Sequence, residues 1–173
     1  MSKSGPEIQL LHARNISRAL DLDPLLPTLP PLMYDKILIP VDLSSANEAV
    51  FSQALELASA GKTDIILLHV IETLQDDEPG EMDDFYDELR EDADAKMKEW
   101  AGAMADEGFE VQAAITYGER GPEITRVAEE NDVDLIVQRS HRLRREDENP
   151  NVGTVSHQVA IFAPCSVLLV RPE

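Results

Sequence analysis

A polar loop rich in arginine lies between an apolar run and a helical pattern near the end of the sequence. The run DLIVQ (Asp134–Gln138) predicts a strand, and the pair Gly153-Thr154 precedes a predicted helix. A strand, a loop and a helix N-terminus in that order often hold a phosphate, because the first N–H groups of a helix lie at the positive end of its dipole. This loop carries arginine where a phosphate loop would carry glycine: Arg139, Arg142, Arg144 and Arg145.

The other side chains that could do chemistry give weaker signals. Asp42 directly follows an apolar run and could simply cap the next helix. His69 lies inside an apolar run and is predicted to be a hydrogen-bonded core histidine, whereas His157 is predicted to be exposed. His141 has no cysteine or histidine at ligand spacing, so no metal site is predicted, and Cys165 is predicted to be an inert thiol. No pair of nucleophile and base is evident, so we do not expect an enzyme.

The overall composition indicates a folded, acidic protein. The chain has 173 residues, which suits one domain, and a net charge of −19 argues against binding to nucleic acid or anionic membranes. No apolar run approaches the ~20 residues of a membrane helix, and the N-terminus is a poor secretory signal, so a cytoplasmic location is expected. The acidity fits an ordinary soluble surface or a high-salt cytoplasm, and charge alone does not distinguish these.

The first 33 residues differ from the rest. Five prolines interrupt them, and we expect a short amphipathic helix between Glu7 and Leu20 followed by a Pro-rich linker. This N-terminal extension is interpreted either as an arm without a role or as an arm that docks on its own domain or on a partner. The second predicted domain comprises residues 34–173.

From Tyr34 onward, short apolar strands alternate with amphipathic helices. The predicted strands are Lys36–Val41, Asp64–Ile71, Glu110–Tyr117, Asp134–Gln138 and Cys165–Arg171. The first predicted helix runs from a capping box at Ser45 and Glu48 to Gly61. The second runs from about Phe85 to near Gly108, with apolar residues at helical spacing: Phe85, Leu89, Ala93, Met97, Trp100 and Met104. Two further helices are expected to begin at Gly121 and at Gly153. This alternation predicts an α/β fold with an open parallel sheet and helices on both faces. Ligands of such sheets bind at the carboxyl ends of the strands.

Four segments together resemble the universal stress protein family. They are YDKILIPVDLSSANEAV, IILLHVIE, GERGPEITRVAEENDVDLIVQRSH and VGTVSHQVAIFAPCSVLLVRP, and the resemblance covers Tyr34 to Pro172. It implies a Rossmann-like five-stranded parallel sheet in the order 3-2-1-4-5. It also implies a regulatory or protective role in stress responses and a homodimer paired through the last strand. The family contains members that bind ATP and members that do not.

The resemblance also implies where a nucleotide would bind. Asp42 matches the acidic residue near the ribose, and Val70 matches the residue whose backbone meets the adenine. The family loop G-x2-G-x9-G-[ST] has its first two glycines at Arg139 and Arg142, with Ser140 and His141 between them. Its closing pair is at Gly153-Thr154, followed by Val155. Ten residues, Leu143 to Val152, separate Arg142 from Gly153 where the family has nine.

The two missing glycines lead us to expect weak or lost ATP binding. Glycine lets backbone N–H groups approach a phosphate closely, whereas arginine fills that space. In one interpretation the arginines pair with the acidic stretch Asp76–Asp94 or with residues 146–148 and close the site. In the alternative, Arg139 and Arg142 clamp an anion or nucleotide through their guanidinium groups. No cofactor is certain, and ATP with magnesium stays possible under the resemblance.

The final strand is expected at the edge of the sheet. Its residues are Ser166, Val167, Leu168, Leu169 and Val170, and neither proline nor lysine blunts it. An exposed apolar edge strand promotes aggregation unless it is paired or covered. Pairing with a second copy is the favoured expectation, and cover by the Pro-rich arm around Leu25–Leu32 is the alternative.

Overall fold

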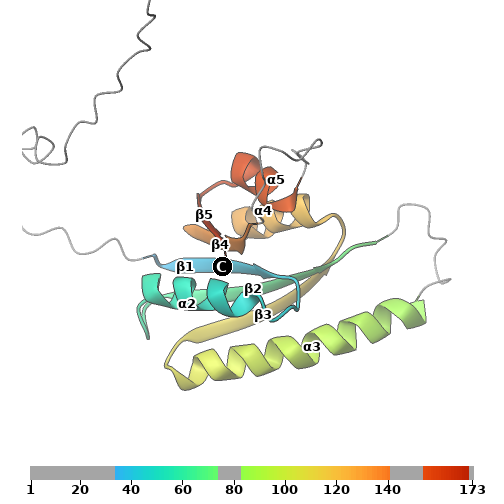
Figure 1. The fold of residues 1–173 in the computed structure, drawn as a ribbon, viewed down its shortest axis with the longest axis horizontal. Helices are drawn as coiled ribbons and strands as arrows, with labels where there is room; N and C mark the ends of the chain where they lie inside the picture. Colours follow the sequence, from blue (N-terminus) through green and yellow to red (C-terminus); the bar gives the residue numbers. More distant parts are fainter. Residues whose placement is uncertain (1–33, 74–82, 141–153, 172–173) are drawn as a thin grey trace, which may run out of the picture. The chain divides into compact units, whose positions relative to one another are not determined.

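The structure, a computed structural model, describes residues 34–73, 83–140 and 154–171 and contains one parallel sheet. Its strands are β1 (Lys36–Val41), β2 (Asp64–Ile71), β3 (Glu110–Tyr117), β4 (Leu135–Arg139) and β5 (Ser166–Val170). They lie in the order β3-β2-β1-β4-β5, and all neighbouring strands are parallel (Figure 1). The predicted fold class and strand order are confirmed. β4 extends one residue beyond the predicted strand and therefore includes Arg139.

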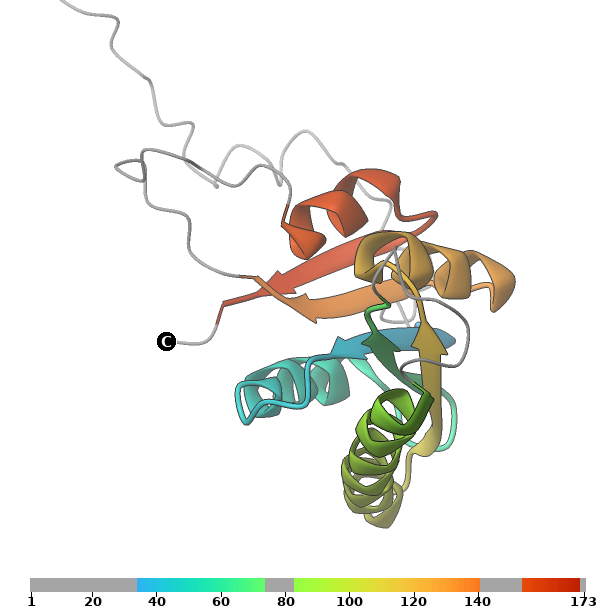
Figure 2. The same cartoon turned by 90° about the vertical axis from the view of Figure 1, so that its right-hand side faces the viewer.

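In the described part of the chain, four helices cover the two faces of this sheet. They are α2 (Asn47–Leu57), α3 (Asp83–Asp106), α4 (Arg120–Glu130) and α5 (Val155–Phe162). Figure 2 shows the sheet between two helix pairs, with α2 and α3 on one face and α4 and α5 on the other. Consecutive parallel strands need a crossover connection, and each helix here provides one.

Side-chain alternation along the strands forms a core on each face. In β1, Ile37 and Ile39 pack toward α2 and α3, whereas Leu38 packs toward α4 and α5, and all three are fully buried. A central strand of a parallel sheet is covered on both faces, so its residues are apolar without interruption. This explains why the run KILIPV is continuous rather than alternating.

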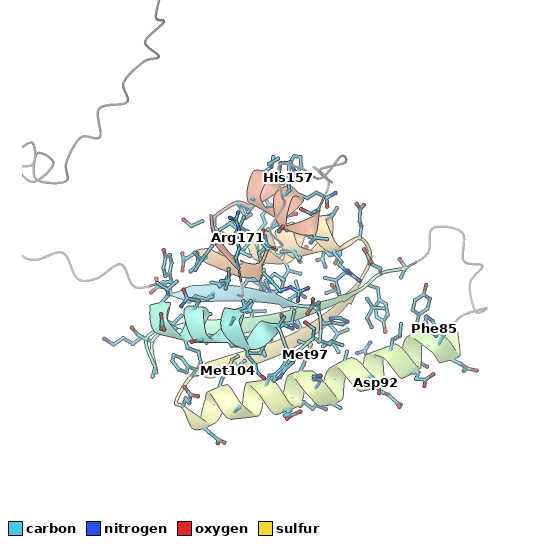
Figure 3. All side chains as sticks on the ribbon, viewed as in Figure 1. Phe85, Asp92, Met97, Met104, His157 and Arg171 are labelled. Atoms are coloured by element: carbon cyan, nitrogen blue, oxygen red, sulfur yellow. The ribbon has the colours of Figure 1, made fainter. Side chains whose placement is uncertain are left out.

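The helix α3 is buried over only part of its length. Ala93, Met97 and Met104, which the helical spacing placed on one face, are buried against the sheet. Phe85 and Leu89 continue the same spacing, yet their exposed fractions are 48% and 37%. Figure 3 labels Met97 and Met104 between α3 and the sheet, and Phe85 near the amino-terminal end of the helix. The periodicity therefore predicted the helix correctly, and the structure shows that only its carboxyl-terminal part is covered by the sheet.

The predicted capping box before α2 is wrong. The helix begins at Asn47, its N-cap residue is Ala46, and no side chain caps it. The preceding turn is instead organised by Asp42, whose carboxylate accepts hydrogen bonds from Ser44 and Asn47. The predicted helix and linker of the N-terminal extension lie outside the described residues, and the boundary at residue 34 stays a prediction.

Helices α4 and α5 approach each other closely at Gly121. A Cβ atom added there would lie 2.2 Å from Oε1 and 3.2 Å from Cβ of Gln158 in α5. Glycine at this position therefore lets the first turn of α5 lie against α4. That contact places the N-terminus of α5 at the carboxyl end of β4.

Candidate functional site

A pocket of about 240 Å³ lies at the carboxyl ends of β1, β2 and β4. Five of the predicted site residues line it: Asp42, Val70, Arg139, Thr154 and Val155. Ser140 lies beside β5, where its N–H group donates a hydrogen bond to the carbonyl of Val170 at 2.8 Å, and it is not among the lining residues. The remaining predicted residues, His141, Arg142 and Gly153, lie outside the described residues.

One wall of this pocket is apolar. Leu68 and Val70 contribute to it from β2, Ile124 from α4 and Val155 from α5. These side chains belong to the core on the α4 and α5 face, where Val70 and Ile124 are buried. Such a wall suits a flat apolar group such as a heterocyclic base.

Asp42 is a polar residue of the pocket lining and holds the turn that follows β1. Its Oδ1 atom accepts hydrogen bonds from the backbone N–H of Ser44 at 3.1 Å, from Ser44 Oγ at 2.7 Å and from Asn47 Nδ2 at 3.0 Å. Asn47 is buried, and its Nδ2 also donates to the carbonyl of Ser44 at 3.0 Å. The carboxylate is thus fixed in position by its own turn.

The electrostatic environment keeps Asp42 ionised. Partial burial opposes the charge, but the hydrogen bonds from Ser44, the positive charge of Arg139 and the hydrogen bond from Asn47 outweigh it and lower the pKa of Asp42 below its usual value. Asp42 therefore presents a negative charge to the pocket at neutral pH.

Arg139 pairs with this carboxylate. Its Nη2 atom lies 2.8 Å from Asp42 Oδ2, and its Nη1 donates to Ser44 Oγ at 3.3 Å. The exposed side-chain fractions are 24% for Arg139 and 40% for Asp42, so the pair lies at the pocket edge rather than in free solution. The sequence suggested the acidic stretch Asp76–Asp94 or residues 146–148 as partners of the arginines. Residues 146–148 and the first part of that stretch lie outside the described residues, so this pairing stays a prediction. Among the described residues, Arg139 also pairs with Asp42, which the sequence did not suggest.

The N-terminus of α5 forms a third side of the pocket. Thr154 is the N-cap residue without a side-chain cap bond, and its carbonyl accepts from the N–H groups of His157 and Gln158. Thr154, Val155 and Ser156 line the pocket, so the first turn of the helix lies at it. The first N–H groups of a helix attract anions. The predicted helix N-terminus is therefore at the expected place.

Arg120 contributes a second arginine at the rim. It begins α4, and its Nη2 lies 2.9 Å from Glu72 Oε2, with both side chains about half exposed. Exposed ion pairs of this kind are weak. Arg120 therefore adds positive charge near the mouth with little constraint on its side chain.

Several polar residues at the pocket were not predicted from the sequence. Asn47, Arg120, Gln138 and Ser156 line it, and Ser44 contacts Asp42 and Arg139 beside it. The order Asp42-Leu43-Ser44 carries the signal of a turn in which an aspartate accepts from the residue two positions later, so Ser44 could have been found. A buried Asn47 has no comparable local signal.

The remaining candidates have structural explanations. A ring nitrogen of His69, Nδ1, lies 2.9 Å from the carbonyl oxygen of Val41, so this histidine is hydrogen-bonded as predicted. It is only partly buried and lines the pocket, so its predicted place in the core is wrong. His157 is exposed, as expected. Burial, followed by the charge of Asp134, raises the pKa of the Cys165 thiol, which fits an inert cysteine. Within residues 34–73, 83–140 and 154–171, acidic, histidine and cysteine side chains form no cluster that could hold a metal ion.

The described helices include none with the length and apolar character needed to cross a membrane. The one helix of sufficient length, α3, carries many charged side chains.

Comparisons with known proteins agree with the fold and with the resemblance. The model of the universal stress protein family matches residues 33–171. The curated "Universal stress protein MJ0577" of Methanocaldococcus jannaschii is 29% identical over 157 residues, covering 81% of this chain and 96% of that protein. A solved structure described for MJ0577 has a TM-score of 0.71 at 30% identity and covers 82% of this chain and 99% of its own.

Two more distant solved structures share the fold and carry adenine nucleotides. A universal stress protein family protein from Arabidopsis thaliana with AMP bound has a TM-score of 0.59 at 18% identity and covers 80% of this chain and 92% of its own. A universal stress protein in complex with cAMP has a TM-score of 0.60 at 19% identity and covers 79% of this chain and 97% of its own.

Proposed function

Because the chain belongs to the universal stress protein family, we propose that it is a non-catalytic regulatory or protective stress-response protein with a weak adenine-nucleotide site. The observation that carries this proposal is the ion pair between Arg139 and Asp42 at the edge of the pocket, with its 2.8 Å separation. In this pair, Arg139 binds the Asp42 carboxylate, which the family resemblance assigns to the contact with the ribose.

The arrangement of the pocket supports an adenine nucleotide as the class of ligand. An apolar wall at Val70 suits the base, Asp42 suits the ribose, and the N-terminus of α5 suits a phosphate group. The AMP and cAMP in the two structural neighbours support the same class of ligand.

Two features support weak rather than tight binding. The family loop has glycine at the positions of Arg139 and Arg142, where close backbone approach to phosphate is needed. The pocket volume of about 240 Å³ is also below the ~300–1,000 Å³ of ordinary small-molecule sites. Both features reduce the contacts available to a triphosphate.

Calorimetric titration with ATP, with and without magnesium, tests this proposal. We expect a Kd well above ~1 μM, corresponding to less than ~8 kcal/mol of binding free energy. Micromolar or tighter binding would contradict the weakness of the site and place the chain among the ATP-binding members. Hydrolysis of ATP that depends on Asp42, measured against Asp42→Asn, would contradict the non-catalytic role.

A second candidate function is an anion- or nucleotide-binding switch in which Arg139 and Arg142 clamp phosphates. It is favoured by the position of Arg139 at the pocket, since a guanidinium fork binds phosphate without glycine. Under this candidate, Arg142→Gly weakens nucleotide binding by tenfold or more. Under the weak-site proposal, the same substitution leaves affinity unchanged or improves it. Arg126→Gln on α4, which removes an equal charge outside the pocket lining, is the matched control.

We also propose that the protein acts in the cytoplasm as a homodimer through β5 and binds neither nucleic acid nor membranes. The net charge of −19 supports the exclusion of phosphate-rich surfaces, because these need a basic partner. The edge position of β5 supports the dimer.

A further inference from the structure

We propose that Gln138 contacts the base of the bound nucleotide and makes the pocket accept aminopurines such as adenine in preference to oxopurines. In this inference, the Oε1 atom of Gln138 accepts a hydrogen bond from the exocyclic amino group of adenine. The inference rests on the proposed adenine-nucleotide site and adds the residue that distinguishes adenine from hypoxanthine and guanine. Gln138 thus becomes a specificity-determining residue of that site.

The first step of the argument is the burial of a polar side chain in the pocket lining. Gln138 lies on β4, is 3% exposed and lines the pocket. A primary amide has two N–H donors and an oxygen with two acceptor sites. In the described part of the chain, this amide makes one hydrogen bond, from Nε2 to the carbonyl oxygen of Ser156 at 3.4 Å, which is long for an N–H···O bond. A buried amide with so few partners is costly, and a ligand that pairs with it removes that cost.

The second step is the orientation of the amide. The carbonyl oxygen of Ser156 can only accept a hydrogen bond, so the amide atom beside it must be Nε2 and not Oε1. A flipped amide would bring two acceptor oxygens together at that distance, and they would repel each other. Among the described residues Oε1 of Gln138 accepts no hydrogen bond, so this oxygen keeps its acceptor sites for a donor on a ligand.

The third step is the position of Gln138 beside the apolar wall of the pocket. Side chains alternate along a strand, so Gln138 lies on the same sheet face as Ile136, which belongs to the core beneath α4 and α5. The wall residues Leu68, Val70 and Ile124 belong to the same core. A base that packs on this wall therefore shares one side of the pocket with the amide of Gln138.

The fourth step compares the groups that purines offer to an acceptor oxygen. Adenine carries an amino group at C6, which donates a hydrogen bond, whereas guanine carries an oxygen there, which accepts. Hypoxanthine has the same oxygen. An oxopurine therefore leaves Oε1 of Gln138 buried against a second acceptor. A site built to hydrogen-bond one group of its ligand rejects the analogue that lacks this group more strongly than an apolar pocket does.

The experiment measures Kd values for AMP, IMP and purine riboside 5′-monophosphate by NMR titration at ~0.15 M salt in the full chain and its variants. The three ligands share the ribose and the phosphate, and C6 of the base carries an amino group, an oxygen or a hydrogen, respectively. In the parent chain we expect AMP to bind at least about tenfold more tightly than IMP, the effect of one hydrogen bond to a buried group, with the third ligand between them. Equal Kd values for AMP and IMP overturn the inference.

Gln138→Met isolates the contribution of the amide, because methionine has a similar length and volume without a strong hydrogen-bonding group. The preference for AMP over IMP should fall to about threefold or less. The control Gln53→Met makes the same exchange at an exposed position of α2 outside the pocket lining and should keep the preference of the parent chain. If Gln138 merely holds α5 in place through Ser156, all three ligands weaken together and the preference stays. That result overturns the inference while nucleotide binding itself stands.

Gln138→Asn decides the matter if thermal melting shows that Gln138→Met is unfolded. Asparagine keeps an amide on β4, but its shorter side chain withdraws the oxygen from the ligand. The preference for AMP over IMP should fall in this variant as well, and an unchanged preference overturns the inference. Absence of binding of all three ligands to the parent chain and to Gln53→Met overturns the proposed nucleotide site, and the inference with it.

Discussion

Asp42 illustrates how one residue can serve both the fold and the site. Its Oδ1 atom fixes the turn before α2, and its Oδ2 atom faces Arg139 in the pocket. The two oxygens of one carboxylate therefore have separate partners. The effect of Asp42 on stability can be measured separately from its effect on binding, because an unfolding experiment needs no ligand.

The lowered pKa of Asp42 predicts a specific pH dependence of stability. A carboxyl group with a depressed folded-state pKa adds stability above its unfolded pKa of about 3.9, and this stability is lost as the pH falls through the folded value. Asp42→Asn should therefore lower the free energy of unfolding at pH ~7, by up to about 1 kcal/mol because 40% of the Asp42 side chain is exposed. The deficit relative to the parent chain should shrink below pH ~4.

Urea unfolding of both proteins between pH ~3 and ~7 measures this effect. Glu99→Gln, on the exposed side of α3, removes one acidic charge elsewhere and controls for the general change in net charge. A deficit that stays constant with pH would show that Asp42 contributes through shape and not through its charge.

Leu43 supplies a second prediction at this scale. Its φ angle is +61°, in the left-handed region that bulky side chains rarely occupy, and its side chain is partly buried against the core. A β-branched residue of equal volume tolerates this backbone less well. Leu43→Ile should therefore destabilise the protein by about 1–2 kcal/mol.

The matched control is Leu55→Ile, because Leu55 is also partly buried against that core but lies within α2. Its cost should be below ~1 kcal/mol, as for other volume-conserving exchanges. Equal costs in chemical denaturation would show that the backbone at Leu43 is not strained.

The candidate site was only partly predictable from individual residues. Asp42, Val70 and Thr154 all line the pocket, because Asp42 follows β1, Val70 lies near the carboxyl end of β2 and Thr154 precedes α5. The ion pair of Arg139 with Asp42 was not predicted, because the two residues are 97 positions apart and are brought together by the pairing of β1 with β4. Local patterns carry no information about such a contact.

At the scale of elements, α3 shows the limit of periodicity. Helical spacing of apolar residues predicts which face of a helix is apolar, but it contains no information about how far the sheet extends beneath that face. Every strand was predicted within about a residue because buried parallel strands are continuous apolar runs. The capping box failed because a carboxylate outside the helix organised the turn instead.

The two halves of α3 should therefore differ in their response to truncation. Met97→Ala should lower the free energy of unfolding by about 2–5 kcal/mol, since this side chain is fully buried and its removal leaves a cavity. Leu89→Ala should cost less than ~1 kcal/mol, since Leu89 is 37% exposed. Both values come from denaturant unfolding of the full chain. Similar losses at the two positions would mean that the amino-terminal half of α3 is covered in solution.

At the scale of the whole molecule, β5 has one side without a neighbouring strand among the residues that the structure describes. It is the last strand of the sheet, and Val167, Leu168 and Leu169 are only partly buried. On the adjoining helix α5, Ile161 and Phe162 are 59% and 72% exposed. Apolar surface of this kind next to an unpaired strand is characteristic of an interface.

We predict that this edge pairs with the same strand of a second copy. An antiparallel pair across a two-fold axis satisfies the outer N–H and C=O groups of both strands at once. Light scattering of the full chain should then give twice the 19.2 kDa mass of one chain. Leu169→Lys should give a monomer because it places a charge at the interface, whereas Leu57→Lys, at the end of α2, should leave the dimer intact.

The opposite result has a defined meaning. A monomeric full chain contradicts the dimer and leaves the outer side of β5 to be covered from within the same chain. Residues 1–32 contain the Pro-rich, leucine-containing segment, and proline-rich segments readily adopt the extended conformation that can lie along a strand. A chain that begins at Met33 separates the two explanations: if it dimerises while the full chain does not, residues 1–32 cover the edge. If both are dimers and Leu169→Lys makes both monomeric, the strand pairs with a second copy, because removal of those residues then changes nothing at β5.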